Sequence, residues 1–240
     1  MLAACSTPVT AQPPVLVVSV AASVNDALDE IAGQYRAATG VTVALNAGGS
    51  NTLARQIVEG AKAGLFVSAD QAQMDAVAKA GRIAAGTRTN LLTNELVVIA
   101  SPSSMELTLA RVIAGRVNRL AMGEPAAVPA GVYGRRWLEH EGAWTRLEPK
   151  VVPFPTVRAV LSAVENGRAD AGIVYRTDAM IAPSVRVIAT VPSKEHAYLD
   201  ISYPAAVIAG PMEAEAKRFL EFLNGPQARA VFARHGFGFP

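Results

Sequence analysis

Short apolar runs alternate with amphipathic segments along almost the whole chain. The run VLVVSVA (15–21) predicts a buried strand, and the periodic segment 24–38 that follows predicts a helix stopped by Gly40. The same order returns twice, with apolar runs at 41–47 and 65–70 that are each followed by a helical pattern. This alternation predicts an α/β fold in which mainly parallel sheets carry helices on both faces.

Two longer apolar runs, at 91–100 and 201–210, divide the chain. A second alternating series of strands and helices lies between them. We interpret the two runs as crossings between two lobes. The expected organisation is a discontinuous first lobe, residues 15–95 plus 206–240, with a second lobe, residues 96–205, inserted into it.

Composition excludes several classes of protein. The chain has 240 residues, of which 51% are hydrophobic and 18% are charged, so it can bury a large core and is not a disordered or coiled-coil chain. The net charge of +2 comes from scattered Lys and Arg, and there is no basic run that would favour nucleic acid. No apolar stretch reaches the roughly 18 residues of a membrane span.

The only cysteine, Cys5, lies in MLAACST, which resembles the lipobox whose cysteine is acylated in bacterial lipoproteins. Only four residues precede it, so the charged and apolar regions of a signal peptide are missing. The start is therefore truncated or the match is chance, and both readings stay open. If Cys5 is lipidated, residues 1–14, rich in proline and polar side chains, form a tether. One cysteine also excludes an internal disulfide.

Several predicted helices begin with small or hydroxyl residues. These starts are Ser23, the segment 48–50, the segment 129–131 and the segment 156–157. The first N–H groups of a helix lack partners and the helix dipole is positive there, so converging helix starts bind an anion without Lys or Arg. For each position alone, however, a helix cap or a turn is the commoner explanation, and Tyr175 alone would be a core aromatic.

Five segments, in order, extend this pattern from about Val15 to the C-terminus: AASVNDAL, GGSNTLARQIVEGAKAGLFVSADQAQMD, VPAGVYGRRWLEHEGAW, TVRAVLSAVENGRADAGIVYRTDA and GPQARAVFARHGF. Together they resemble the periplasmic molybdate-binding proteins of bacterial molybdate ABC transporters. The resemblance implies a two-lobed solute-binding protein that closes around molybdate or tungstate. It also implies an ABC permease as partner and a location in the periplasm or tethered outside the cytoplasmic membrane.

The resemblance also implies which residues hold the ligand as an oxyanion, with no free metal cation and no cofactor. They are two serine hydroxyls, two backbone N–H groups and one tyrosine hydroxyl, from Ser23, Ser50, Ala130, Val157 and Tyr175. The chain departs from the family pattern at Gly49 and Asn51, where further serines are common, and at Gly64, where an aspartate is common. We expect the first two to change the number of hydroxyls and the third to affect strand-end packing.

The predicted donors suit a fully ionised tetrahedral anion. Molybdate carries no proton near neutral pH, whereas phosphate usually keeps one and needs an acceptor carboxylate, which none of the five positions supplies. Sulfate is also fully ionised but smaller, so a binding protein for sulfate or another oxyanion remains the alternative. An enzyme is not expected, because the three histidines are isolated and no nucleophile elbow surrounds Ser23 or Ser50. Another alternative is the effector lobe of a transcription regulator, but that lobe would need an attached DNA-binding domain. We also expect the protein to be a monomer.

Overall fold

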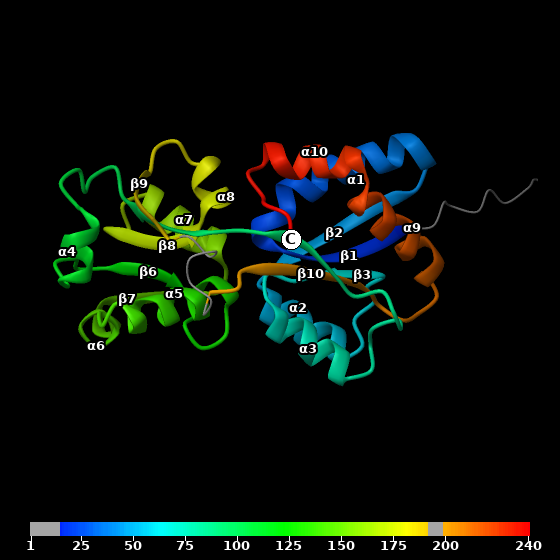
Figure 1. Ribbon diagram of the computed structural model, residues 1–240, viewed down its shortest axis with the longest axis horizontal. Coiled ribbons are helices and arrows are strands. Elements are labelled where there is room, and N and C mark those ends of the chain that lie inside the picture. Colours follow the sequence, from blue (N-terminus) through cyan, green and yellow to red (C-terminus); the bar gives the residue numbers. More distant parts are fainter. Residues whose placement is uncertain (1–14, 192–198) are drawn as a thin grey trace, which may run out of the picture.

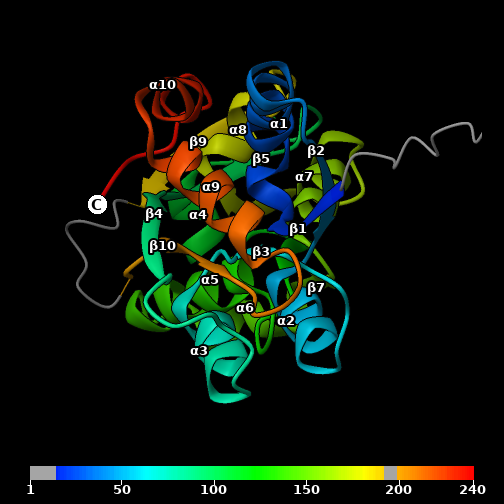
Figure 2. The same cartoon turned by 90° about the vertical axis from the view of Figure 1, so that its right-hand side faces the viewer.

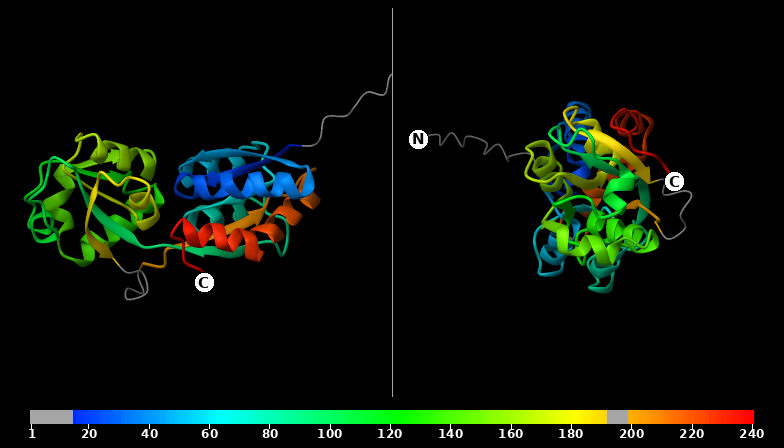
Figure 3. Two further views of the ribbon diagram at one scale, coloured as in Figure 1. Left: turned by 90° about the horizontal axis from the view of Figure 1, so that it is seen from above. Right: turned by 90° about the vertical axis from the view of Figure 1, so that its left-hand side faces the viewer.

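The computed structural model describes residues 15–191 and 199–240. Two five-stranded sheets, each covered by helices, form two lobes that lie side by side (Figure 1). Seen from above, the lobes are joined by extended segments of the chain (Figure 3). The predicted two-lobed α/β fold is confirmed. The predicted tether and Cys5 lie outside the described residues.

The first lobe contains both ends of the described chain. Its sheet has the order β2-β1-β3-β10-β4, with β1 (Val15–Ala21), β2 (Thr42–Gly48), β3 (Leu65–Val67), β4 (Thr89–Thr93) and β10 (Ser202–Val207). One face carries α1 (Asn25–Thr39), α9 (Glu213–Asn224) and α10 (Pro226–Arg234), and the other carries α2 (Ser50–Val58) and α3 (Gln71–Lys79) (Figure 2).

The second lobe is formed by the middle of the chain. Its sheet has the order β7-β6-β8-β5-β9, with β5 (Leu96–Ala100), β6 (Leu120–Gly123), β7 (Val151–Phe154), β8 (Ala171–Tyr175) and β9 (Arg186–Val191). Its helices are α4 (Leu109–Ile113), α5 (Pro129–His140), α6 (Trp144–Leu147), α7 (Val157–Glu165) and α8 (Arg176–Met180), with a 3₁₀ turn at Glu148–Lys150. Helices α5 and α6 lie on one side of the sheet, and α7 and α8 lie on the other (Figure 1).

Both sheets are mainly parallel, as expected, because four strands of each run in the same direction and one strand, β10 or β5, runs against them. In the first, β1 pairs in parallel with β2 and β3, whereas β10 pairs antiparallel with β3 and β4. In the second, β6 pairs in parallel with β7 and β8, whereas β5 pairs antiparallel with β8 and β9. The reason is connectivity: β5 and β10 enter from the other lobe, so they run away from the boundary between the lobes while their neighbours run toward it.

The first crossing falls at the expected boundary between residues 95 and 96, and the second differs in position from the prediction. Strand β4 ends at Thr93 in the first sheet and β5 begins at Leu96 in the second, so the apolar run 91–100 is two strands. All of β10 pairs in the first sheet, so the expected lobe boundary between residues 205 and 206 falls inside this strand. The chain passes from one sheet to the other within a continuous apolar run, and hydrophobicity therefore cannot locate the point of crossing.

The core follows from the alternation of runs. Leu16, Val18 and Val20 of β1 are fully buried, as expected for a strand with helices on both faces of its sheet. Helix α1 places Leu28 and Ile31 against them, also fully buried.

No helix among the described residues is long and apolar enough to cross a membrane. The carboxyl ends of the parallel strands meet at the boundary between the lobes, and this positions the candidate site.

Candidate functional site

Strand ends from both lobes surround one small cavity of about 20 Å³. The residues that line it are Ala21, Ala22, Ser23, Gly48, Gly49, Ser50, Ala69, Val128, Pro129, Ala130, Thr156, Val157 and Tyr175. This set contains all five predicted site residues, and each of them is buried. A cavity this small suits an ion of a few atoms better than a sugar or a peptide.

Strand register brings the two serines together. Ala21 and Gly48 are the last residues of β1 and β2 and are paired across the parallel ladder. Ser23 and Ser50 each follow two residues later, so both lie at the same edge of the sheet. Strands β6 and β7 also end in register, and this places the starts of α5 and α7 at the facing edge of the second lobe.

Ser23 does not cap the helix that follows it. It lies in a 3₁₀ turn (Ala22–Val24), and neither this turn nor α1 has a side-chain cap hydrogen bond, so the ordinary explanation of Ser23 as a helix cap does not hold. The Ser23 hydroxyl lies 3.0 Å from the Tyr203 hydroxyl, which accepts a hydrogen bond of 3.2 Å from Asn94 Nδ2. If Tyr203 then donates to Ser23, the Ser23 proton is free to point at a ligand.

Ser50 is the first residue of α2, and it does not cap this helix either. Its Oγ accepts a 3.0 Å hydrogen bond from the backbone N–H of Ala69. Because the oxygen is held as an acceptor, the hydroxyl proton is left to donate. Thr156 behaves differently, since its Oγ1 accepts from Ala159 N and caps α7. Both cavity serines therefore depart from the ordinary capping explanation.

The second lobe presents backbone donors. Val157 is the first residue of α7 and Ala130 is the second residue of α5, so the N–H group of each has no partner within its own helix. Helix α5 starts very close to the end of β6. A Cβ atom at Gly131 would lie 2.1 Å from the carbonyl oxygen of Gly123, so only glycine permits this approach.

Tyr175 ends β8 and is 1% exposed. Its hydroxyl is buried and has no hydrogen-bond partner among the described residues. Burial raises the pKa of Tyr175 well above its ordinary value, so the phenol is neutral and able to donate. A buried hydroxyl without a partner is uncommon in folded proteins, and here it lies on the wall of the cavity.

The cavity is uncharged. No Lys, Arg, Asp or Glu of the described part of the chain lines it, so neutral hydroxyl and N–H groups supply its polarity. Residues 15–191 and 199–240 also contain no cluster of three or more His, Cys, Asp or Glu side chains that could hold a metal ion. Such an arrangement stabilises a negative charge through hydrogen bonds and helix dipoles.

Comparison with known proteins agrees with this geometry. The family model described as bacterial extracellular solute-binding protein matches residues 16–238. The chain belongs to this family.

This solute-binding protein is similar to individual proteins whose names state a ligand. It is 41% identical to the molybdate-binding protein ModA of Escherichia coli (strain K12), over 92% of this chain and 88% of that protein. The structure of the Azotobacter vinelandii periplasmic molybdate-binding protein is 26% identical, with a TM-score of 0.82 over 94% of this chain and 99% of that one. The sulfate-binding protein SubI of Mycobacterium tuberculosis H37Rv has a TM-score of 0.80 at 15% identity, over 93% of this chain and 86% of that one. The last likeness shows the fold alone.

The departures from the family pattern fall in different places. Gly49 lines the cavity, and a Cβ atom there would lie 2.8 Å from the carbonyl oxygen of Pro155 in the other lobe. Asn51 is absent from the lining, and its Oδ1 is buried without a partner in the described residues. Gly64 lies at the far end of the sheet beside a different cavity, and a Cβ atom there would meet Leu16 Cδ1 at 2.5 Å.

Sequence reasoning missed the residues that orient the donors of this solute-binding protein. Tyr203 and Asn94 position the Ser23 hydroxyl, and the backbone of Ala69 positions that of Ser50. A signal did exist for the first two, because each is a polar group inside a long apolar run. The Ala69 contact depends on the meeting of two segments and has no local signal.

Proposed function

We propose that this solute-binding protein captures molybdate between its two lobes and delivers it to the permease of an ABC transporter. The observation that carries the proposal is the cavity, because its wall offers uncharged hydrogen-bond donors from both lobes and no charged side chain within the described residues. The 41% identity to a molybdate-binding protein supports the same ligand.

The protonation state of the ligand explains the choice of donors. Molybdate near neutral pH has only acceptor oxygens, so every group that faces it should donate. The Ser50 oxygen accepts from the Ala69 N–H, so its hydroxyl can donate, Ser23 can donate when Tyr203 donates to it, and Tyr175 is neutral. A protonated phosphate would need an acceptor, and a cavity without a carboxylate leaves its proton unpaired, which costs about 1–3 kcal/mol.

Tungstate has the same shape and charge as molybdate, so we include it as a ligand. Sulfate is the competing candidate, since a sulfate-binding protein shares the fold. The five predicted positions, Ser23, Ser50, Ala130, Val157 and Tyr175, would form the first contacts of the anion in either case. We favour molybdate because the relative with the higher identity, 41%, is named as a molybdate-binding protein, whereas the sulfate-binding protein is 15% identical.

Capture and delivery follow from the position of the cavity. Donors from both lobes are available to one anion only when the lobes are together, so the ligand favours the closed form over the open one. The closed form would then be recognised by a membrane permease. We further propose a monomer that binds its ligand without catalysis, located in the periplasm or held outside the cytoplasmic membrane by a lipid on Cys5.

Isothermal titration calorimetry with molybdate, tungstate, sulfate and phosphate tests the ligand. We expect tight binding of molybdate and tungstate, weaker binding of sulfate, and no detectable binding of phosphate at neutral pH. Tight sulfate binding with no response to molybdate would replace the proposed ligand with the alternative. Metabolic labelling with a fatty acid, compared between the native chain and Cys5→Ala, tests the anchor.

A further inference from the structure

Arg158, the second residue of α7, extends from the second lobe into the first. Its Nη1 lies 2.9 Å from Asp26 Oδ2 at the start of α1, and its Nη2 donates a 3.3 Å hydrogen bond to the carbonyl oxygen of Ser23. The side chain is 24% exposed, so the contact is partly shielded from water. One guanidinium therefore joins the helix starts of both lobes beside the cavity.

The same guanidinium is held from behind by a buried carboxylate. Arg158 Nε lies 2.7 Å from Asp178 Oδ1, whose side chain is fully buried in α8. The second oxygen of Asp178 accepts a 3.2 Å hydrogen bond from the backbone N–H of Tyr175. A planar group with several donors can make all of these contacts at once, which an ammonium group cannot.

These contacts connect Arg158 to three of the five ligand-facing positions without making it a ligand. Val157 precedes it in the chain, Ser23 accepts from it, and Tyr175 is linked to it through Asp178. Arg158 does not line the cavity. We call Arg158, Asp26 and Asp178 the interlobe clamp.

We propose that Arg158 is a positioning residue that holds the two lobes together over the bound oxyanion, through Asp26 and the Ser23 carbonyl, and so slows release of the ligand. The inference rests on the proposed function of the cavity. The contacts of Arg158 with Asp26 and the Ser23 carbonyl form only when the lobes meet, so their energy adds to the closed form and is absent from the open one. Its loss therefore raises the dissociation rate more than it changes the association rate.

The direction in which ligand affinity changes when Asp26 is neutralised distinguishes a clamp from a simple charge effect. The clamp has two carboxylates and one guanidinium, and the ligand is a dianion. If Asp26 acted only through its charge, neutralising it would reduce repulsion and tighten binding. If Asp26 anchors Arg158 across the lobes, the same substitution weakens binding. The two explanations predict opposite changes in affinity.

The test is calorimetry and stopped-flow dissociation with molybdate for the native protein, Asp26→Asn and Asp29→Asn. Asp29 lies in the same helix and makes the same charge change without an interlobe contact. We expect Asp26→Asn to raise Kd by about two- to fivefold, through faster dissociation, with little change in the thermal stability of the unliganded protein. Asp29→Asn should leave Kd within error of the native value.

A second variant tests Arg158 itself. Arg158→Lys keeps the charge and a partner for the buried Asp178, but it cannot contact all three groups, so dissociation should again be faster. Unchanged or tighter binding in Asp26→Asn, or native dissociation in Arg158→Lys, would overturn the clamp. If the native protein failed to bind molybdate, the proposed ligand would be wrong, and the same comparison with sulfate would still test the clamp.

Discussion

The two lobes approach the cavity with the same strand-to-helix turns but with different kinds of donor. The first lobe offers the side-chain hydroxyls of Ser23 and Ser50, each oriented by a second residue. The second lobe offers the helix-start N–H groups at Ala130 and Val157 together with the Tyr175 hydroxyl. A hydroxyl can be deleted without moving the chain, whereas a backbone donor is lost only when the backbone moves.

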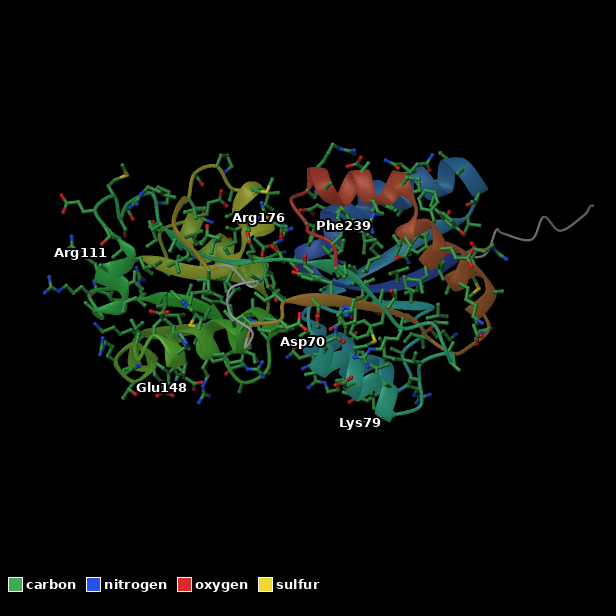
Figure 4. All side chains as sticks on the ribbon, viewed as in Figure 1. Asp70, Lys79, Arg111, Glu148, Arg176 and Phe239 are labelled. Carbon is green, nitrogen blue, oxygen red and sulfur yellow. The ribbon has the colours of Figure 1, made fainter. Side chains whose placement is uncertain are left out.

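Each donor type also has a different relation to stability. The Ser23 and Ser50 oxygens have protein partners, so they contribute to the unliganded fold as well as to the site. The Tyr175 hydroxyl has none among the described residues and can contribute only through a ligand or water. In the view with side chains, Asp70 lies near the boundary between the lobes, with Arg176 on the second lobe and Phe239 on the first (Figure 4).

The largest effect is expected where the lobes must approach. Gly49→Ala places a Cβ atom 2.8 Å from the Pro155 carbonyl oxygen of the other lobe, and backbone atoms cannot yield easily at that distance. The Gly49 backbone (φ −67°, ψ 132°) suits alanine, and the other close neighbour of the Cβ atom, Asn51 Oδ1 at 2.7 Å, is a side-chain atom that can turn away, so the unliganded protein should keep most of its stability. Without full closure the anion loses the donors of the second lobe, and affinity for molybdate should fall by at least about a hundredfold.

The matched control is Gly33→Ala, because a Cβ atom there would have no neighbour within 4 Å. It should bind like the native protein in calorimetry. Native affinity in Gly49→Ala would mean that the ligand is held without the close approach seen here.

The next largest effect on affinity is expected at Ser50 of the first lobe, and Thr156 of the second lobe serves as the comparison. Ser50→Ala removes a donor to a dianion, worth about 1.5–3 kcal/mol, so Kd should rise roughly 10- to 150-fold. The unliganded protein should lose only about 1 kcal/mol, from the unpaired Ala69 N–H. Thr156→Ala should reverse this ranking, because loss of the α7 cap costs about 1 kcal/mol of stability and removes no expected ligand contact. Calorimetry and denaturant unfolding measure both, and equal losses in Ser50→Ala would favour a purely structural serine.

A smaller effect with opposite signs is expected at Tyr175. Tyr175→Phe deletes a hydroxyl that has no partner in the described protein, so the unliganded melting temperature should stay the same or rise. Molybdate affinity should fall about tenfold, because one donor is lost. Thermal unfolding with and without molybdate measures both changes. A lower melting temperature together with native affinity would assign the hydroxyl to the fold.

A gradual effect of pH, on stability rather than on ligand affinity, is expected at Asp178. Burial raises the pKa of Asp178 to about 7, although Arg158 and the Tyr175 N–H act to lower it. The unfolded chain titrates near 3.9, so the folded protein holds an extra proton between these values. The free energy of unfolding should therefore fall as pH rises from about 4 to about 7.

Denaturant unfolding across this pH range checks the prediction, with Asp178→Asn expected to lose the slope and Asp29→Asn expected to keep it. An identical slope in the Asp178→Asn protein would mean that other groups cause the pH dependence. Because Asp178 belongs to the second lobe, the slope reports on that lobe's side of the boundary.

Much of the fold was predictable because the apolar runs and helical periods are local. The strand at 15–21, the helix stopped by Gly40 and the helix that follows the run 65–70 all occur where expected. The one reversed strand in each sheet was not predictable, since the direction in which β5 and β10 enter depends on which lobe precedes them. The boundary expected between residues 95 and 96 falls between β4 and β5, whereas the one expected between 205 and 206 falls inside β10, because the apolar run gives no signal of the crossing.

The sequence by itself determined that hydroxyl and small residues follow buried strands and begin helices, and that no basic cluster accompanies them. Tertiary structure alone decided that Ser23 and Ser50 do not cap their helices, that Tyr203 and Ala69 orient them, and that Arg158 reaches Asp26. The physical reason is that a hydrogen bond depends on distances of about 3 Å, and residues far apart in the chain acquire such distances only when the sheets and the two lobes pack.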